Sequence, residues 1–152
     1  MKIHPAWRAL SVAAVAMVAF GLAGAWCSLG ERQEAASRRG YVLLQLDAGQ
    51  LRVADFLAAR LAHDFAALDW TARLRATTST LVAANALLQQ RRASDARARL
   101  APLVEEGDAP AAAHFLLGRA LIQLGEKAAG EAEQAKARAL APDAPLFRQG
   151  KE

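Results

Sequence analysis

The sequence predicts an all-α protein in which an N-terminal transmembrane or signal helix precedes a short array of helical hairpins. The 152 residues are 54% hydrophobic but only 6% aromatic, and much of the apolar content is alanine. Alanine is the best helix former, and its small side chain lets neighbouring helices approach closely. Apolar residues recur at three- and four-residue spacing, and no useful stretch alternates between apolar and polar residues as a strand would.

The first expected element is an apolar helix at residues 9–29, a segment without any charged side chain. About 20 such residues can cross a bilayer as a helix, and Trp7 and Trp26 would then lie near its two interfaces. Ala23-Gly24-Ala25 also fits the cleavage site of a secretory signal. We favour a retained anchor because the apolar run continues past that site. Residues 1–30 are therefore treated as an anchor or a signal peptide.

The charges that flank this segment predict its orientation. Lys2, Arg8 and the amino terminus precede it, and the ten residues after it carry a smaller excess of positive charge. The positive-inside rule then places the N-terminus in the cytoplasm and the remainder of the chain outside. Since the composition is typical of a bacterial protein, we expect a single-pass inner-membrane protein with its C-terminal domain in the periplasm. If the signal is cleaved, the domain would be secreted to the periplasm.

A short linker and a degenerate helical pair are expected next. Residues 31–40 are polar and should form a linker or a helical extension of the apolar segment. Residues 41–76 have a helical pattern, with an apolar stripe at three- and four-residue spacing from Leu51 to Phe65. A second helix is predicted to begin near Asp69, and Gly49 is the expected helix breaker before the stripe.

Two copies of a helical hairpin follow one another without a gap at residues 77–110 and 111–144. Sliding the chain by 34 residues superposes small residues and turns of the two copies. The aligned positions are Ala84 with Gly118, Ala96 with Gly130, Leu103 with Ala137, and the turn at 90–92 with the turn at 124–126. Small residues at such positions let the two helices of a hairpin cross closely, because a large side chain would push them apart.

In length and in the placement of small residues, each copy resembles a tetratricopeptide repeat. The copy at 111–144 is the better match, because it contains Leu117-Gly118 and the closing Pro142. The copy at 77–110 lacks the Leu-Gly pair, and Pro102 should kink or shorten its second helix. The resemblance implies a helical-hairpin array, and the alternative is a generic alanine-rich helical bundle.

A short C-terminal cap is expected to complete the domain at residues 77–152. Leu146 and Phe147 should fold back on the last hairpin. If they do not, they form an exposed apolar edge, which would invite self-association or a partner.

The resemblance implies a non-catalytic function, because tetratricopeptide repeats bind other proteins. Proteins of similar plan are accessory factors of cytochrome maturation, of pilus or secretion assembly, and of periplasmic methanol-type dehydrogenase systems. The expected partner is a protein of such an envelope complex, held on the face that the first helix of each hairpin lines. Carried over by position, this face comprises Leu81, Asn85, Leu88, Gln89, Phe115, Arg119, Ile122 and Gln123. An amide can bond an extended backbone, and an arginine can hold a carboxylate.

No residue pattern predicts an enzyme, a metal site or a cofactor. The histidines are His4, His63 and His114, and none has a ligand at metal-binding spacing. His63 and Asp64 are neighbours on a predicted helix and are expected to point apart. Cys27 is the only cysteine, which excludes an internal disulfide. Interspersed charges without a basic stripe argue against nucleic-acid binding.

A structural membrane subunit is the competing class of function. In that case the apolar helix itself would make the main contact, through Gly21 and Gly24 on one face. Small residues let membrane helices approach closely. The hairpins would then be a spacer.

Overall fold

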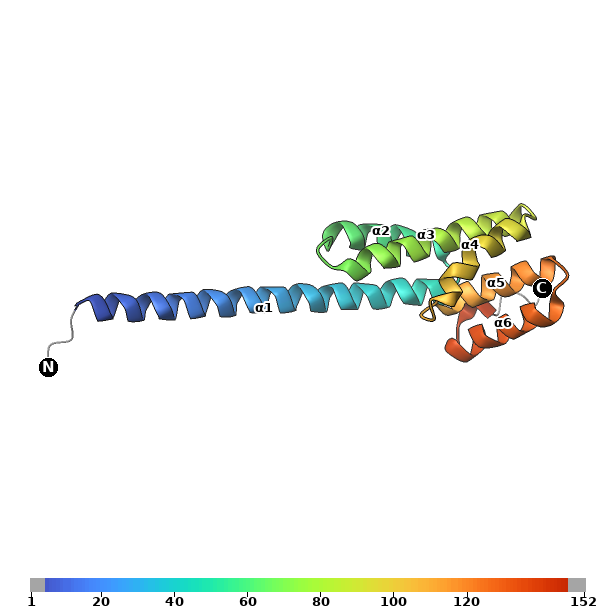
Figure 1. The fold of residues 1–152 in the computed structure, drawn as a ribbon. Coiled ribbons are helices and arrows are strands. Elements are labelled where there is room, and N and C mark those ends of the chain that lie inside the picture. The colour runs from blue at the N-terminus through green and yellow to red at the C-terminus, as the bar shows by residue number, and fades with distance from the viewer. Residues whose placement is uncertain (1–4, 148–152) are drawn as a thin grey trace. The chain divides into compact units, whose positions relative to one another are not determined.

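The computed structural model describes residues 5–147, and their side chains from Gly24 onward. The elements, in chain order, are α1 (Pro5–Asp47), α2 (Leu51–Asp64), α3 (Asp69–Gln89), α4 (Ala93–Glu105), α5 (Ala111–Gln123), α6 (Lys127–Leu140) and the 3-10 helix η1 (Pro145–Phe147) (Figure 1). No strand occurs in this part of the chain, which confirms the all-α class there. Contacts divide the chain after Ser37 into two units, described separately below.

The first unit consists of α1 as far as Ser37. The predicted anchor or signal lies mostly outside the described side chains, because these begin at Gly24. Within the described residues, no helix is both long enough and apolar enough to cross a bilayer. Residues 31–40 continue α1 as a helix. Residues 31–40 are thus the expected helical extension of the apolar segment and not a non-helical linker.

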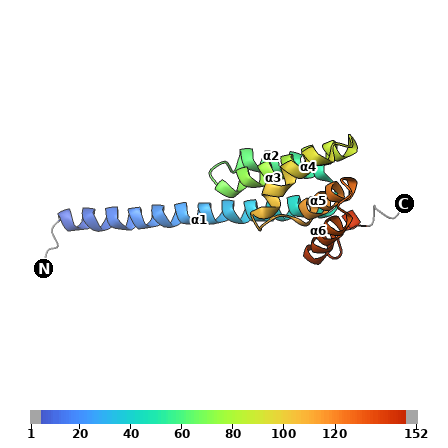
Figure 2. The same cartoon turned by 45° about the vertical axis from the view of Figure 1, so that its right-hand side comes forward.

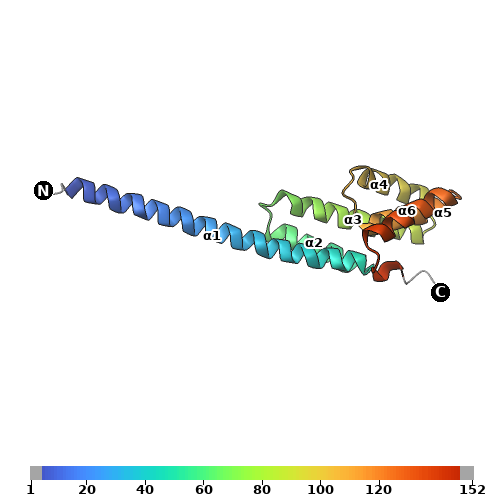
Figure 3. The same ribbon diagram turned by 90° about the horizontal axis from the view of Figure 1, so that it is seen from below.

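In the second unit each helix from α2 to α6 packs against the next one in the chain (Figures 2 and 3). The turns contain residues in the left-handed region, where glycine carries no Cβ penalty. Gly49, Gly107 and Gly125 have φ values of 75°, 81° and 88°. Arg91 has φ 59° in the α3–α4 turn, at the position that aligns with Gly125 in the internal repeat. The two hairpins therefore share a turn geometry.

The close crossing expected within the last hairpin is present. A Cβ added to Gly118 of α5 would lie 2.7 Å from the carbonyl oxygen of Gly130 in α6. A Cβ added to Gly130 would lie 2.7 Å from the carbonyl oxygen of Gly118. The equivalent residues of α3 and α4, Ala84 and Ala96, are both 0% exposed. Only glycine fits at the α5–α6 crossing, whereas the α3–α4 crossing accommodates a methyl group.

A single apolar core joins the ends of the second unit. The stripe predicted over α2 is its buried face, formed by Leu51, Ala54, Ala58 and Leu61. At the C-terminus Leu146 is buried, and the Phe147 ring meets Phe115 of α5 edge-to-face with centroids 5.6 Å apart. Leu146 and Phe147 therefore fold back on the hairpin and do not form an exposed edge. Pro102 is exposed, and α4 continues past it to Glu105.

Candidate functional site

A cleft of about 610 Å³ lies in the second unit between α1, α3 and the connection from α4 to α5. The last turns of α1 contribute Leu43 and Leu46, and α3 contributes Leu74, so part of its lining is apolar. The end of α6 also reaches it, through Leu140. Its volume lies within the range of roughly 300–1,000 Å³ that is usual for ligand sites, which combine an apolar lining with a few polar groups.

One side of the cleft is basic and aromatic. The guanidinium of Arg39 on α1 lies 5.5 Å from the centroid of the Trp70 ring at the start of α3, a cation–π contact. Arg73 follows Trp70 after about one helical turn and also lines the cleft. Among the described residues, neither arginine forms an ion pair with a carboxylate. Two guanidinium groups are therefore available to an anionic ligand.

The remaining charged lining is acidic. Asp47 ends α1, and Glu106 and Asp108 stand in the connection between α4 and α5. None of the three is paired with a cation in the part of the chain that the structure describes. Burial raises the pKa of Asp47, because desolvation disfavours its charged form. A cation bound beside Asp47 would offset that cost.

The two sets of charges are separated along α1. Arg39 and Asp47 lie eight residues apart on this helix, a rise of about 12 Å at 1.5 Å per residue. The separation explains why the two side chains do not neutralise each other. The cleft therefore presents positive charge at one end and negative charge at the other, with leucine side chains between them.

None of the eight predicted binding residues lines this cleft. Leu81 and Leu88 are only 0% and 2% exposed. The prediction for these two leucines is corrected, because their side chains pack in the core and offer no surface to a partner. The physical reason is that α3 packs against α2, α4 and α5, and both leucines belong to the apolar core that these helices share.

The other six predicted residues keep some exposure. Gln89, Ile122 and Gln123 are exposed near the C-terminal ends of α3 and α5. Asn85 and Arg119 are half-buried, and these two helices contact each other. Phe115 is half-buried against Phe147. These six residues remain a predicted surface that is distinct from the cleft.

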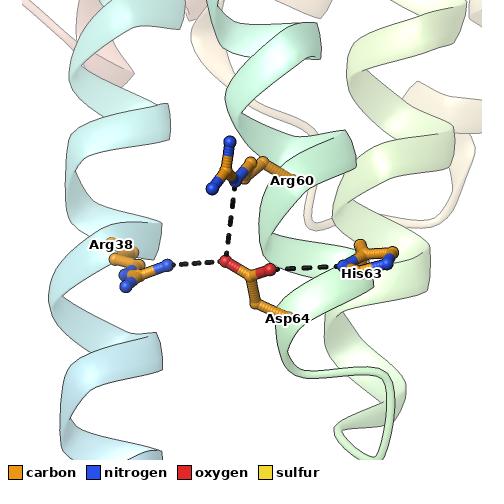
Figure 4. A network of polar contacts seen from close by, with 4 residues as sticks. All are labelled: Arg38, Arg60, His63 and Asp64. Carbon is orange, nitrogen blue, oxygen red and sulfur yellow. Dashed lines mark hydrogen bonds and ion pairs between the residues drawn. The ribbon is translucent and has the colours of Figure 1, made fainter.

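A polar network at the C-terminal end of α2 joins that helix to α1 (Figure 4). Arg38 Nη1 donates to Asp64 Oδ2 at 2.9 Å, and Arg60 Nε lies 3.9 Å from the same oxygen. His63 Nδ1 lies 3.3 Å from Asp64 Oδ1, so the expectation that these neighbours point apart is wrong at this helix end. The hydrogen bond from His63, followed by that from Arg38, lowers the pKa of Asp64 despite desolvation. The network ties two helices together.

A second polar contact links α5 to α6. His114 Nδ1 lies 2.7 Å from Glu133 Oε2, and each side chain is 13% exposed. Lys136 Nζ lies 2.6 Å from Glu133 Oε1. Burial would raise the pKa of Glu133, but the hydrogen bonds from His114 and Lys136 outweigh it and hold that pKa below its ordinary value. Nowhere in the described residues do three His, Cys, Asp or Glu side chains group so that they could hold a metal ion.

Sequence reasoning missed the cleft because its residues come from distant segments. Arg39 and Trp70 lie on different helices, and no local spacing predicts that they meet. The sequence signal that could have pointed to the cleft is Trp70, which lies about one helical turn before Arg73 on the predicted helix.

No family model matches this sequence, and comparisons with curated proteins and with solved structures find no similar protein.

Proposed function

We propose that this chain is a membrane-anchored, non-catalytic protein that holds a protein component of a bacterial envelope complex. The observation that carries the proposal is the cleft of the second unit, which has an apolar lining and unpaired charges of both signs. Charged groups that lack an ionic partner among the described residues are suited to recognise a complementary protein, since an interface of opposite charge sets specificity and register.

The helical hairpins support a binding function. Their repeat length, their shared turn geometry and the glycine contact between Gly118 and Gly130 agree with a tetratricopeptide-like array. Such arrays present surfaces for other proteins. In this chain the N-terminal half of α3 and the end of α1 supply the cleft, so we place the binding site there and not on the predicted face around Asn85 and Arg119.

The uncharged segment at residues 9–29 supports the anchor, together with the basic residues that precede it. We propose that the second unit lies in the periplasm, close to the inner membrane. A partner bound in the cleft would thereby be kept near the membrane surface.

The test is a crosslinking pull-down of the full-length chain from its native envelope, with the partners identified by mass spectrometry. Recovery of one consistent set of envelope proteins supports the proposal. Recovery of copies of this chain alone contradicts it and favours a structural membrane subunit. The variant Gly24→Leu separates these outcomes. A Cβ at Gly24 meets no atom within 4 Å in the structure, so the larger side chain fits within this chain and would disturb only a contact with another helix. Loss of capture in this variant would assign the main contact to the apolar helix.

A further inference from the structure

We infer that the cleft binds an extended segment of a partner protein that carries an acidic side chain, a central apolar side chain and a basic side chain on one face. This inference rests on the proposed function and specifies the ligand of the same site. Its basis is the complementarity of the three parts of the cleft: the arginine end, the leucine lining and the carboxylate end.

The arginine end fits a carboxylate. Arg39 stacks at 5.5 Å on Trp70, which orients its guanidinium, and Arg73 lines the same end of the cleft from α3. Guanidinium groups match carboxylates through two parallel N–H···O bonds. Neither arginine uses these donors for an ion pair with another described residue.

The carboxylate end fits a lysine or arginine. Asp47 forms this end of the cleft, Glu106 and Asp108 also line the cleft, and no described cation neutralises any of the three. Asp47 is half-buried, so its carboxylate gains most from a counter-charge. The same three carboxylates would repel a polyanion, which argues against a nucleic acid as the ligand.

The spacing of the charges indicates an extended chain. Arg39 and Asp47 are separated by about 12 Å along α1. An extended segment advances about 3.3 Å per residue, and alternate side chains share one face. Its first, third and fifth side chains therefore cover about 13 Å. An acidic residue at the first position, an apolar residue at the third and a basic residue at the fifth match the charges and the intervening Leu43 and Leu74. The separation is too large for the two charges of a free amino acid.

The experiment measures binding of fluorescent peptides to the full-length chain in detergent by anisotropy. The reference peptide is acetyl-Ala-Glu-Ala-Leu-Ala-Lys-Ala-amide, and the comparison peptides carry Glu at both charged positions, Lys at both, or Gln at both. We expect the reference peptide to bind at least roughly tenfold more tightly than each of the others, as the loss of one charge-assisted contact predicts. Equal binding of the Gln peptide would overturn the inference.

Charge reversal in the protein gives a sharper criterion. Arg73→Glu should weaken the reference peptide by roughly tenfold and make the peptide with two Lys residues the preferred ligand. Arg75→Glu is the matched control, because Arg75 is exposed on the same helix and does not line the cleft. An equal effect of the two variants would contradict the inference. Circular dichroism verifies that both variants are folded.

The same variants separate this inference from the proposed function. If Arg73→Glu loses the partner captured by the wild type while Arg75→Glu retains it, both are supported. If both variants capture the partner as well as the wild type does, the protein-binding function stands and the assignment of the ligand to the cleft is overturned. If the wild type captures no protein, the proposed function fails.

Discussion

The substitution Gly118→Ala tests the close crossing of α5 and α6. The new Cβ would lie 2.7 Å from the Gly130 carbonyl oxygen, whereas ordinary van der Waals contact begins at 3.4 Å, a deficit of about 0.7 Å. It would also lie 2.7 Å from Gln134 Cγ. The glutamine side chain can rotate away, but the carbonyl oxygen can move only if the two helices separate. The clash therefore acts on the packing of the whole hairpin.

Two opposing effects set the change in the free energy of unfolding. Overpacking costs about 1–3 kcal/mol, while replacing glycine by alanine inside a helix returns about 1 kcal/mol. The expected result for Gly118→Ala is a loss of about 0–2 kcal/mol in the free energy of unfolding. Gly40→Ala isolates the second effect, because Gly40 lies inside α1 and an added Cβ meets no atom within 4 Å. This control should gain up to about 1 kcal/mol.

The assay is urea and thermal unfolding of the full-length chain, followed by circular dichroism at the helical band. Each kcal/mol shifts Tm by roughly 4–8 °C in a domain near 100 residues. The two substitutions should therefore move Tm in different directions, or at least differ by several degrees. Equal increases in Tm for Gly118→Ala and Gly40→Ala would refute the reasoning, since the backbones could not then be as close as the structure places them.

A double substitution extends the test. Gly130→Ala introduces the reciprocal clash, with its Cβ 2.7 Å from the Gly118 carbonyl oxygen. One separation of the helices relieves both clashes, so the double variant should lose less stability than the two single variants together. Strict additivity would show that the two sites act independently.

Three further predictions concern other parts of the second unit. Arg91→Gly should stabilise the fold by about 0.5–1 kcal/mol, because Arg91 has φ 59° and glycine removes the left-handed strain; calorimetry measures it, and a lower Tm would contradict it. The pKa of Glu133 is held below its ordinary value of 4.5 in the folded chain, so its ionised form should stabilise the fold above about pH 4.5 and lose this effect as pH falls below that value. Glu133→Gln should flatten that part of a Tm-against-pH profile, and an unchanged profile would disprove the contribution. Partner capture should survive Asn85→Ala with Arg119→Ala but not Arg73→Glu; the opposite pattern would move the binding site to the predicted face of α3 and α5.

The helices were predictable because their determinants are local. Asp69 begins α3 as expected, and Gly49 adopts the left-handed φ that ends a helix. The small residues at the hairpin crossings could also be found, because the 34-residue spacing repeats them in one sequence. Gly118 is the clearest case, since its backbone contact explains directly why no side chain stands there.

The cleft was not predictable by the same means. The resemblance assigned Leu81 and Leu88 to a surface, but in this chain both are buried in the core that α3 shares with its neighbouring helices. The pairing of Arg39 with Trp70 depends on tertiary packing between α1 and α3, which leaves no local pattern. Contacts between residues that lie far apart in the sequence can be identified only from the three-dimensional arrangement of the helices.

The glycine contact between α5 and α6 also bears on how the second unit opens. The α5–α6 pair makes the densest contacts between helices of the second unit, so its amide protons should be among the slowest to exchange with solvent. Asp47 is the last residue of α1, and the amide protons of a helix end should exchange sooner. The cleft would then be lost by fraying of one wall while the last hairpin stays intact. A ligand in the cleft would slow exchange in α1 far more than in α5.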